Sequence, residues 1–163
     1  MPTKQIVFAL MTFLHDLFSA IWVGGLITMG LAVLPAARKV LGMSPETKKL
    51  MQVLQKRLSR LVYASIVGLL VTGMLLANRS PGFQGLFGLG NPYATVLGIK
   101  HILVLLMVTI ALIRTLALGR GGRSASPAQE KLKAGLLLFN MVLGVAVLLL
   151  SGFNAALSAL LPA

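Results

Sequence analysis

Four long apolar runs dominate the chain and restrict what it can fold into. They span residues 6–34, 61–77, 93–116 and 134–161. A helix of about 20 mostly apolar residues is long enough to cross the hydrocarbon core of a bilayer. With 57% hydrophobic and 11% charged residues, a chain of 163 residues has more apolar surface than a soluble fold can bury. We therefore predict an all-α fold, a four-helix transmembrane bundle that forms a single domain over residues 1–163.

The distribution of charge predicts how this bundle is oriented. The formal net charge is +12, and the basic residues concentrate in the loops after the first and third runs. They are Arg38, Lys39, Lys48, Lys49, Lys56, Arg57 and Arg60 in one loop, and Arg114, Arg120, Arg123, Lys131 and Lys133 in the other. Basic loops stay on the cytoplasmic side, so both termini and the loop 78–91 are expected outside. This pattern explains the basic charge through the lipid bilayer, and we expect no nucleic-acid partner.

Prolines and loop composition predict where the helices begin and end. Pro35 is expected to end the first helix, whereas Pro92 suits the start of the third, where a missing N–H costs nothing. The stretch 44–60 is interpreted as an amphipathic extension of the second helix that lies on anionic lipid. The loop 78–91 is rich in Gly and Pro and is expected to be irregular.

Four ionisable residues lie inside the first and third runs, and each is a functional hypothesis because such groups are costly in lipid. They are His15, Asp16, Lys100 and His101. The two helices run in the same direction, and both histidines lie about 13 Å below the start of their helices. Asp16 and Lys100 share nearly the same depth, which predicts an intramembrane ion pair. The two neutral imidazoles are expected to meet in the bundle core.

Copper is one ligand that this arrangement suggests. His15 and His101 would supply imidazole nitrogens, and Met11 lies four residues before His15 on the same helix face. A thioether together with imidazole suits Cu(I).

Haem b is the second candidate, held by two histidines or by His15 and Lys100 as axial ligands. Trp22 shares the face of His15 and would pack on a bound ring. Small residues nearby would leave room for a flat macrocycle or, alternatively, serve close helix packing. They are Ser19, Ala20, Gly24, Gly25 and Gly98.

A third hypothesis needs no cofactor. The histidines would then be hydrogen-bonding residues between helices, and the chain an accessory subunit of a larger membrane complex. Asn140, Ser151 and Asn154 are likewise interpreted as interhelical hydrogen-bonding residues. The chain has no cysteine, no nucleophile–base pattern and no phosphate-binding glycine motif. We therefore assign no catalytic residue, and whether the chain is an enzyme stays open: any catalysis would be redox chemistry carried by a cofactor such as haem.

Three segments resemble a known family. HDLFSAIWVGGLITMGLAVLPAAR, residues 15–38, resembles the His-x6-Trp-x-Gly-Gly pattern that opens the membrane domain of the copper-resistance protein D (CopD) family. NPYATVLGIKHILVLLMV, residues 91–108, is similar to its Pro-Tyr-Gly-x-x-Leu-x-x-Lys segment, with Ala94 in place of the glycine. RLSRLVYASIVGLLVTGMLLA, residues 57–77, resembles the helix between them.

The resemblance implies a protein of the bacterial inner membrane that takes part in copper uptake or resistance. The chain also resembles, more distantly, the HemJ-type protoporphyrinogen oxidases, which are four-helix haem b proteins. That likeness would give the site to His15 and Lys100, with His101 as a departure.

Overall fold

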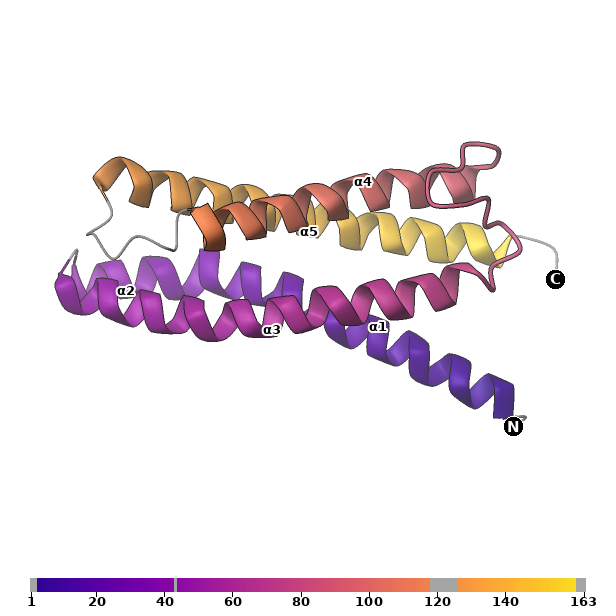
Figure 1. Ribbon diagram of the computed structural model, residues 1–163, viewed down its shortest axis with the longest axis horizontal. Helices are drawn as coiled ribbons and strands as arrows, with labels where there is room; N and C mark the ends of the chain where they lie inside the picture. Colours follow the sequence, from indigo (N-terminus) through magenta and orange to yellow (C-terminus); the bar gives the residue numbers. More distant parts are fainter. Residues whose placement is uncertain (1–2, 43, 118–125, 161–163) are drawn as a thin grey trace.

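The computed structural model describes residues 3–42, 44–117 and 126–160, and every regular element in those ranges is helical (Figure 1). The elements are α1 (Thr3–Ile27), η1 (Thr28–Val33), α2 (Leu34–Leu41), α3 (Pro45–Ala77), α4 (Pro92–Leu112), η2 (Ile113–Ala117) and α5 (Pro127–Ala159). They form four helical segments that are long and apolar enough to cross a membrane. The all-α four-helix membrane bundle is confirmed.

Three of the helices begin with the same two-residue signal, a capping side chain followed by proline. Ser44, Asn91 and Ser126 each accept a hydrogen bond from a backbone N–H in the first turn, and the next residue is Pro. The side chain satisfies a donor that the helix leaves unpaired, and proline has no donor to satisfy. This chemistry fixes the start of α4 at Pro92, as predicted, and extends α3 back to Pro45.

The prediction that Pro35 ends the first helix is wrong. The chain stays helical from Thr3 to Leu41, with the wider π-helical segment η1 directly before α2. A proline ring clashes with the carbonyl four residues earlier, here that of Leu31. A wider π turn at that point separates the two groups, so the helix passes Pro35 without breaking.

The helices are arranged as two pairs. α1 packs along α3, α4 packs along α5, and the pairs meet mainly where α1 contacts α5. Figure 1 shows α4 and α5 above and α1, α2 and α3 below, with the first turns of α1 diverging from the other helices. The core lies where the pairs meet, and is built by Trp22, Val23, Leu26, Val62, Ile66, Met107, Ile110, Leu137, Leu143 and Val147.

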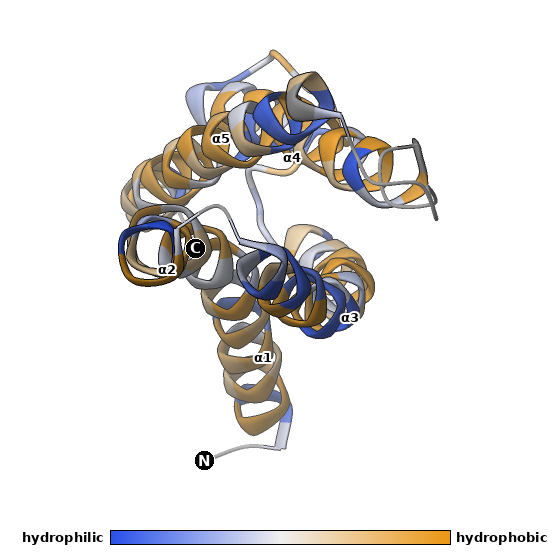
Figure 2. Cartoon of the chain, turned by 90° about the vertical axis from the view of Figure 1, so that its left-hand side faces the viewer, coloured by the Kyte–Doolittle hydropathy of each residue, from blue (hydrophilic) through white to orange (hydrophobic). Residues whose placement is uncertain are grey.

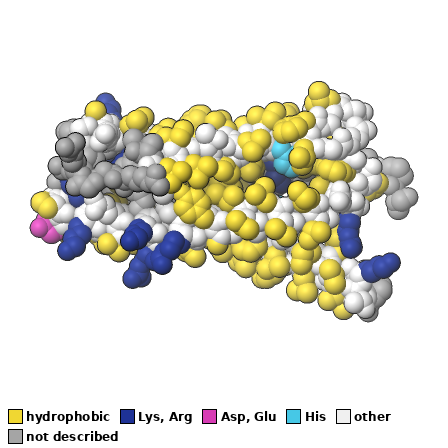
Figure 3. Space-filling model, viewed as in Figure 1, with side chains coloured by type: hydrophobic (Ala, Val, Ile, Leu, Met, Phe, Trp, Pro, Cys, Tyr) yellow, Lys and Arg dark blue, Asp and Glu magenta, His cyan; other side chains and the backbone are white. Residues whose placement is uncertain are grey.

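The two ends of the bundle differ in charge. One end carries both chain termini and the loop 78–91, and we call it the terminal end (Figure 1). The opposite end, called the basic end, carries α2 and the starts of α3 and α5, and lysine and arginine side chains gather there (Figure 3). Between the ends, hydrophobic residues predominate along the helices (Figure 2), and many large apolar side chains face outward. This outer surface suits a lipid bilayer.

Candidate functional site

His15 projects from α1 onto α3 in the half of the bundle nearer the terminal end. Its Nδ1 lies 2.9 Å from Oγ1 of Thr72, a side chain that is only 4% exposed. A Cβ at Gly73 would lie 3.3 Å from Cε1 of His15, so this glycine gives the ring room against α3. The imidazole is therefore held by two consecutive residues of the neighbouring helix.

The hydrogen bonds of Thr72 determine which nitrogen of His15 carries the proton. The Thr72 hydroxyl donates to the carbonyl of Gly68 at 2.7 Å, which uses its single hydrogen. Toward His15 it can then only accept, so Nδ1 of His15 is the donor. In a neutral ring, Nε2 is left with a lone pair to which no described residue donates, which is the form in which histidine binds metals.

His101 is held in the same tautomer by a different neighbour. Its Nδ1 lies 2.9 Å from the carbonyl oxygen of Leu86 in the loop 78–91, and a carbonyl can only accept. The ring also packs edge-on against Phe87, with 6.5 Å between ring centroids. Nε2 of His101 thus also keeps its lone pair, and the side chain connects the loop 78–91 to α4.

No hydrogen bond in the described part of the chain joins the two histidines. α1 and α4 belong to different helix pairs, and each ring is bound to its own partner. The described residues also contain no group of three or more His, Cys, Asp or Glu side chains placed to hold a metal ion. Two imidazoles with open nitrogens are therefore present in one half of the bundle, without a completed coordination shell.

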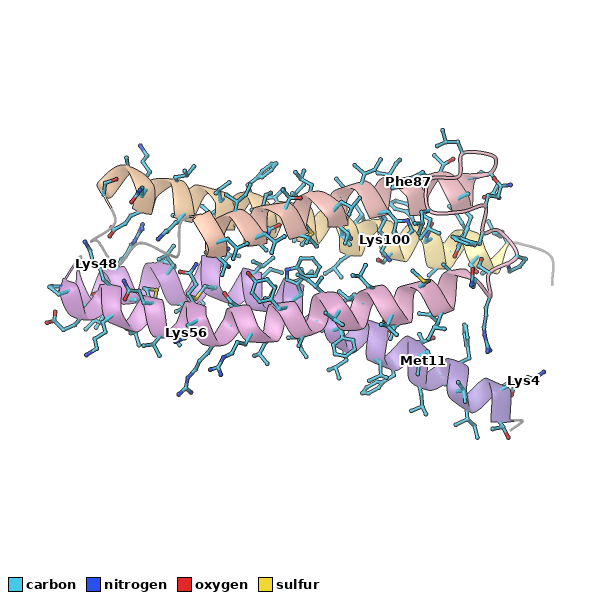
Figure 4. The ribbon with its side chains drawn as sticks, in the orientation of Figure 1. Lys4, Met11, Lys48, Lys56, Phe87 and Lys100 are labelled. Carbon is cyan, nitrogen blue, oxygen red and sulfur yellow. The ribbon has the colours of Figure 1, made fainter. Side chains whose placement is uncertain are left out.

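Lys100 and Asp16 lie beside His15 without forming a direct ion pair. Lys100 is half-buried and points from α4 into the space between the helix pairs (Figure 4). Its charge lies within electrostatic range of His15 and Asp16. Within the described residues, the side-chain ion pair with a nitrogen–oxygen distance below 4.0 Å is formed by Lys48 and Glu130 at the basic end. Figure 3 shows a histidine side chain at the upper helices of the view, with a basic side chain recessed directly below it.

The remaining predicted site residues lie elsewhere. Met11 is half-buried on the diverging part of α1 (Figure 4). Trp22 is only 2% exposed and belongs to the core nearer the basic end. Gly25 packs against Leu58, and Gly98 lies against the backbone of Phe87 and Gly88, which is the close packing that small residues permit.

The polar residues of α5 do not make the interhelical hydrogen bonds that we predicted. Ser151 donates to the carbonyl of Val147 in its own helix. Asn140 has no exposed surface, and neither of its amide atoms has a hydrogen-bond partner among the residues that the structure describes; Oδ1 of Asn154 also lacks one. Asn140 instead lines a cavity together with Arg114 and Tyr63. From the sequence, Arg114 is grouped with the basic loop, because it lies shortly before the end of an apolar run.

Comparison with known families supports the resemblance in part of the chain. The family model described as "Copper resistance protein D" matches residues 52–154. This range includes Lys100 and His101 but begins after α1, so it does not cover His15. No curated protein and no solved structure matches the chain significantly. With well over half of its residues matched and four helices able to span a membrane, the chain belongs to the copper resistance protein D family of multi-pass membrane proteins.

Proposed function

We propose that this protein binds and transfers copper within the bacterial inner membrane, with His15 as the central ligand. The observation that supports this role most directly is the fixed orientation of His15. Its Nδ1 is bound to Thr72, so Nε2 is presented as a ligand that needs no deprotonation. A hydrogen-bond partner behind a metal-binding histidine is typical of metal sites.

Further donors for copper are available in the same half of the bundle. Met11 lies one helical turn before His15, and its thioether is a soft ligand suited to Cu(I). His101 offers a second Nε2 on α4. Because His15 and His101 belong to different helix pairs, an ion bound to both would draw α1 and α4 together. Copper binding in this proposal is thus coupled to the spacing of the two pairs.

The charges near His15 favour a monovalent ion. Lys100 repels a cation, and Asp16 is the carboxylate near enough to offset that repulsion. The other two acidic residues, Glu46 and Glu130, lie at the basic end. Cu(I) costs less to place beside Lys100 than a divalent ion does, since the Coulomb energy scales with the charge. By the positive-inside rule the histidines lie toward the outer face, so copper would be received from outside.

A titration of the purified protein tests this proposal. The detergent-solubilised protein is titrated with Cu(I) in competition with a chromophoric chelator, and the variants His15→Ala, His101→Ala and Met11→Leu are titrated in parallel. We expect stoichiometric binding that His15→Ala abolishes and that the other two variants weaken. Met74→Leu is the matched control, because Met74 is 62% exposed on the outer surface of α3. This variant should bind as the wild type does.

Two results would overturn the copper proposal. One is unchanged stoichiometric binding in His15→Ala, and the other is no Cu(I) binding by the wild type. The absorption spectrum of the same sample, oxidised and reduced, tests the haem hypothesis, because bound haem b gives a Soret band. A Soret band lost in His15→Ala would assign His15 to haem and not to copper.

A further inference from the structure

A second polar site lies nearer the basic end, at a cavity with a volume of about 40 Å³. Polar side chains from all four membrane-spanning segments line it, and Gln55, Ser59 and Thr115 are among them. Trp22 comes from α1, Tyr63 from α3, Arg114 from η2 and Asn140 from α5. The copper proposal gives these residues no role. Their convergence from four separate helices therefore calls for its own explanation.

Several buried polar atoms at this cavity lack hydrogen-bond partners among the described residues. Among the described residues, the buried atoms without a hydrogen bond include Nε1 of Trp22, the Tyr63 hydroxyl, Nε of Arg114, and both Nδ2 and Oδ1 of Asn140. Trp22 is 2% exposed and Asn140 is fully buried. An unpaired polar group in an apolar interior is costly, and native proteins pair nearly all such groups. Five unpaired atoms around one cavity indicate that a polar ligand belongs there.

The chemistry of these atoms favours an anion. Trp22, Arg114 and the amide nitrogen of Asn140 can only donate, and the Tyr63 hydroxyl can donate as well. The Asn140 oxygen is the single atom of the set that can only accept. The chain has three acidic side chains, and none of them lies within 4.0 Å of Arg114. Arg114 is half-buried with its Nε fully buried, and a guanidinium of this kind that lacks a carboxylate partner and lies among donors suits an anion.

The cavity is accessible from the basic end. A wider cavity of about 160 Å³ continues from it, and Met29, Gln55, Arg114 and Leu137 line both. The walls of the wider cavity also carry Arg38, Lys48 and Lys133. Its one carboxylate, Glu130, is paired with Lys48 at 3.1 Å. A cleft lined mostly by one sign of charge concentrates ions of the opposite sign.

We propose that the protein binds a small monovalent anion, a halide or a short carboxylate, at Arg114 in this cavity. The anion accepts hydrogen bonds from Arg114, Trp22 and Asn140 and neutralises the guanidinium. A cavity volume of roughly 10–15 Å³ is enough for one water molecule. This cavity therefore admits an anion of a few heavy atoms and excludes larger anions. The site is separate from His15 and does not depend on copper binding.

Trp22 is the one tryptophan of the chain, and it reports directly on the cavity. Bromide quenches tryptophan fluorescence on contact, so the full-length protein in detergent is titrated with bromide at constant ionic strength, balanced with gluconate. We expect quenching that saturates and that chloride or formate reverses by competition. Gluconate is too large to enter. Competition by chloride alone would define a halide site, and equal competition by formate would extend the site to carboxylates.

Arg114→Gln tests the residue itself. It should raise the bromide concentration at half-saturation by about tenfold or more, since it removes a charged hydrogen-bond donor. Arg57→Gln, at an exposed position of α3, is the matched control and should titrate as the wild type does. If Arg114→Gln fails to fold, the wild-type titration still tests whether bromide binds at a saturable site. Quenching that rises linearly without saturation, or saturation unchanged in a folded Arg114→Gln variant, would overturn the proposal.

Discussion

His15 and Thr72 are joined across the α1–α3 interface by a hydrogen bond of 2.9 Å between Nδ1 and Oγ1. Thr72 in turn donates to the carbonyl of Gly68, one turn earlier in α3. The direction of the imidazole is thus determined by the backbone of the neighbouring helix through a single hydroxyl. This hydroxyl is therefore the first group to remove when the role of His15 is tested.

Thr72→Val should weaken copper binding without unfolding the protein. Valine keeps the shape of threonine but removes the acceptor for Nδ1, so His15 loses its preferred tautomer and orientation. Loss of such a partner typically costs about 10–100-fold in metal affinity. The Cu(I) competition titration measures the change. Thr109→Val is the matched control, because Thr109 bonds only to the carbonyl of Leu105 in its own helix. An affinity equal to that of the wild type would mean that Thr72 does not orient a ligand.

Gly68→Ala should destabilise the pairing of α1 with α3. A Cβ at this position would overlap the ring of Phe18, so the ring or the helix must move. Overpacking of this kind typically costs about 1–3 kcal/mol. Thermal unfolding in detergent should show a lower midpoint. At Gly152 a Cβ meets no neighbouring atom within 4 Å, so Gly152→Ala should leave the midpoint unchanged or raise it slightly. Equal effects at both positions would contradict the packing argument.

Asn140→Leu should change the response of stability to chloride. The amide of Asn140 has no partner in the described part of the chain, so leucine removes no hydrogen bond seen there and relieves the burial of two polar atoms. In gluconate buffer the variant is expected to melt at or above the wild-type temperature. Chloride should then raise the melting temperature of the wild type, since a ligand stabilises the state that binds it, but not that of the variant. A chloride-dependent rise that persists in Asn140→Leu would exclude this residue from the anion site.

The Lys48–Glu130 pair should contribute little to stability. The two groups are 3.1 Å apart, but their side chains keep 47% and 26% of their surface exposed. Ion pairs in such positions are typically worth about 0–1 kcal/mol. A double-mutant cycle with Lys48→Met and Glu130→Gln, measured by thermal unfolding in detergent, should give a coupling energy in that range. A coupling well above it would show that the pair holds the starts of α3 and α5 together.

The sequence was sufficient to predict the membrane bundle because that prediction depends on composition and length. The four apolar runs can be identified without knowing what each helix packs against. Pro92 indicates a helix start because it lacks a backbone N–H. Pro35 was misjudged for a related reason. Whether a proline ends a helix or is accommodated by a π turn depends on how the neighbouring helices pack around it.

The sequence does not predict how each helix is rotated about its own axis. It therefore does not predict which side chains meet at the site. The depth of His15 and His101 follows from counting residues, but the face that each presents does not. The structure turns His15 toward Thr72 and His101 toward Leu86. The cavity at Arg114 was missed because its lining residues come from four helices at unrelated sequence positions, and each of them alone has an ordinary explanation.

The length of α3 has a consequence for where the basic end lies. α3 and α5 each contain 33 residues, which makes each about 50 Å long, whereas the hydrocarbon core is about 30 Å thick. α3 ends a little more than one turn after Thr72, so its excess length lies on the basic side. There we expect the helices to extend beyond the hydrocarbon core, into the headgroup region and the water next to it. The wider cavity is lined by residues of this end, so we expect the proposed anion to approach Arg114 from the aqueous phase without first crossing hydrocarbon.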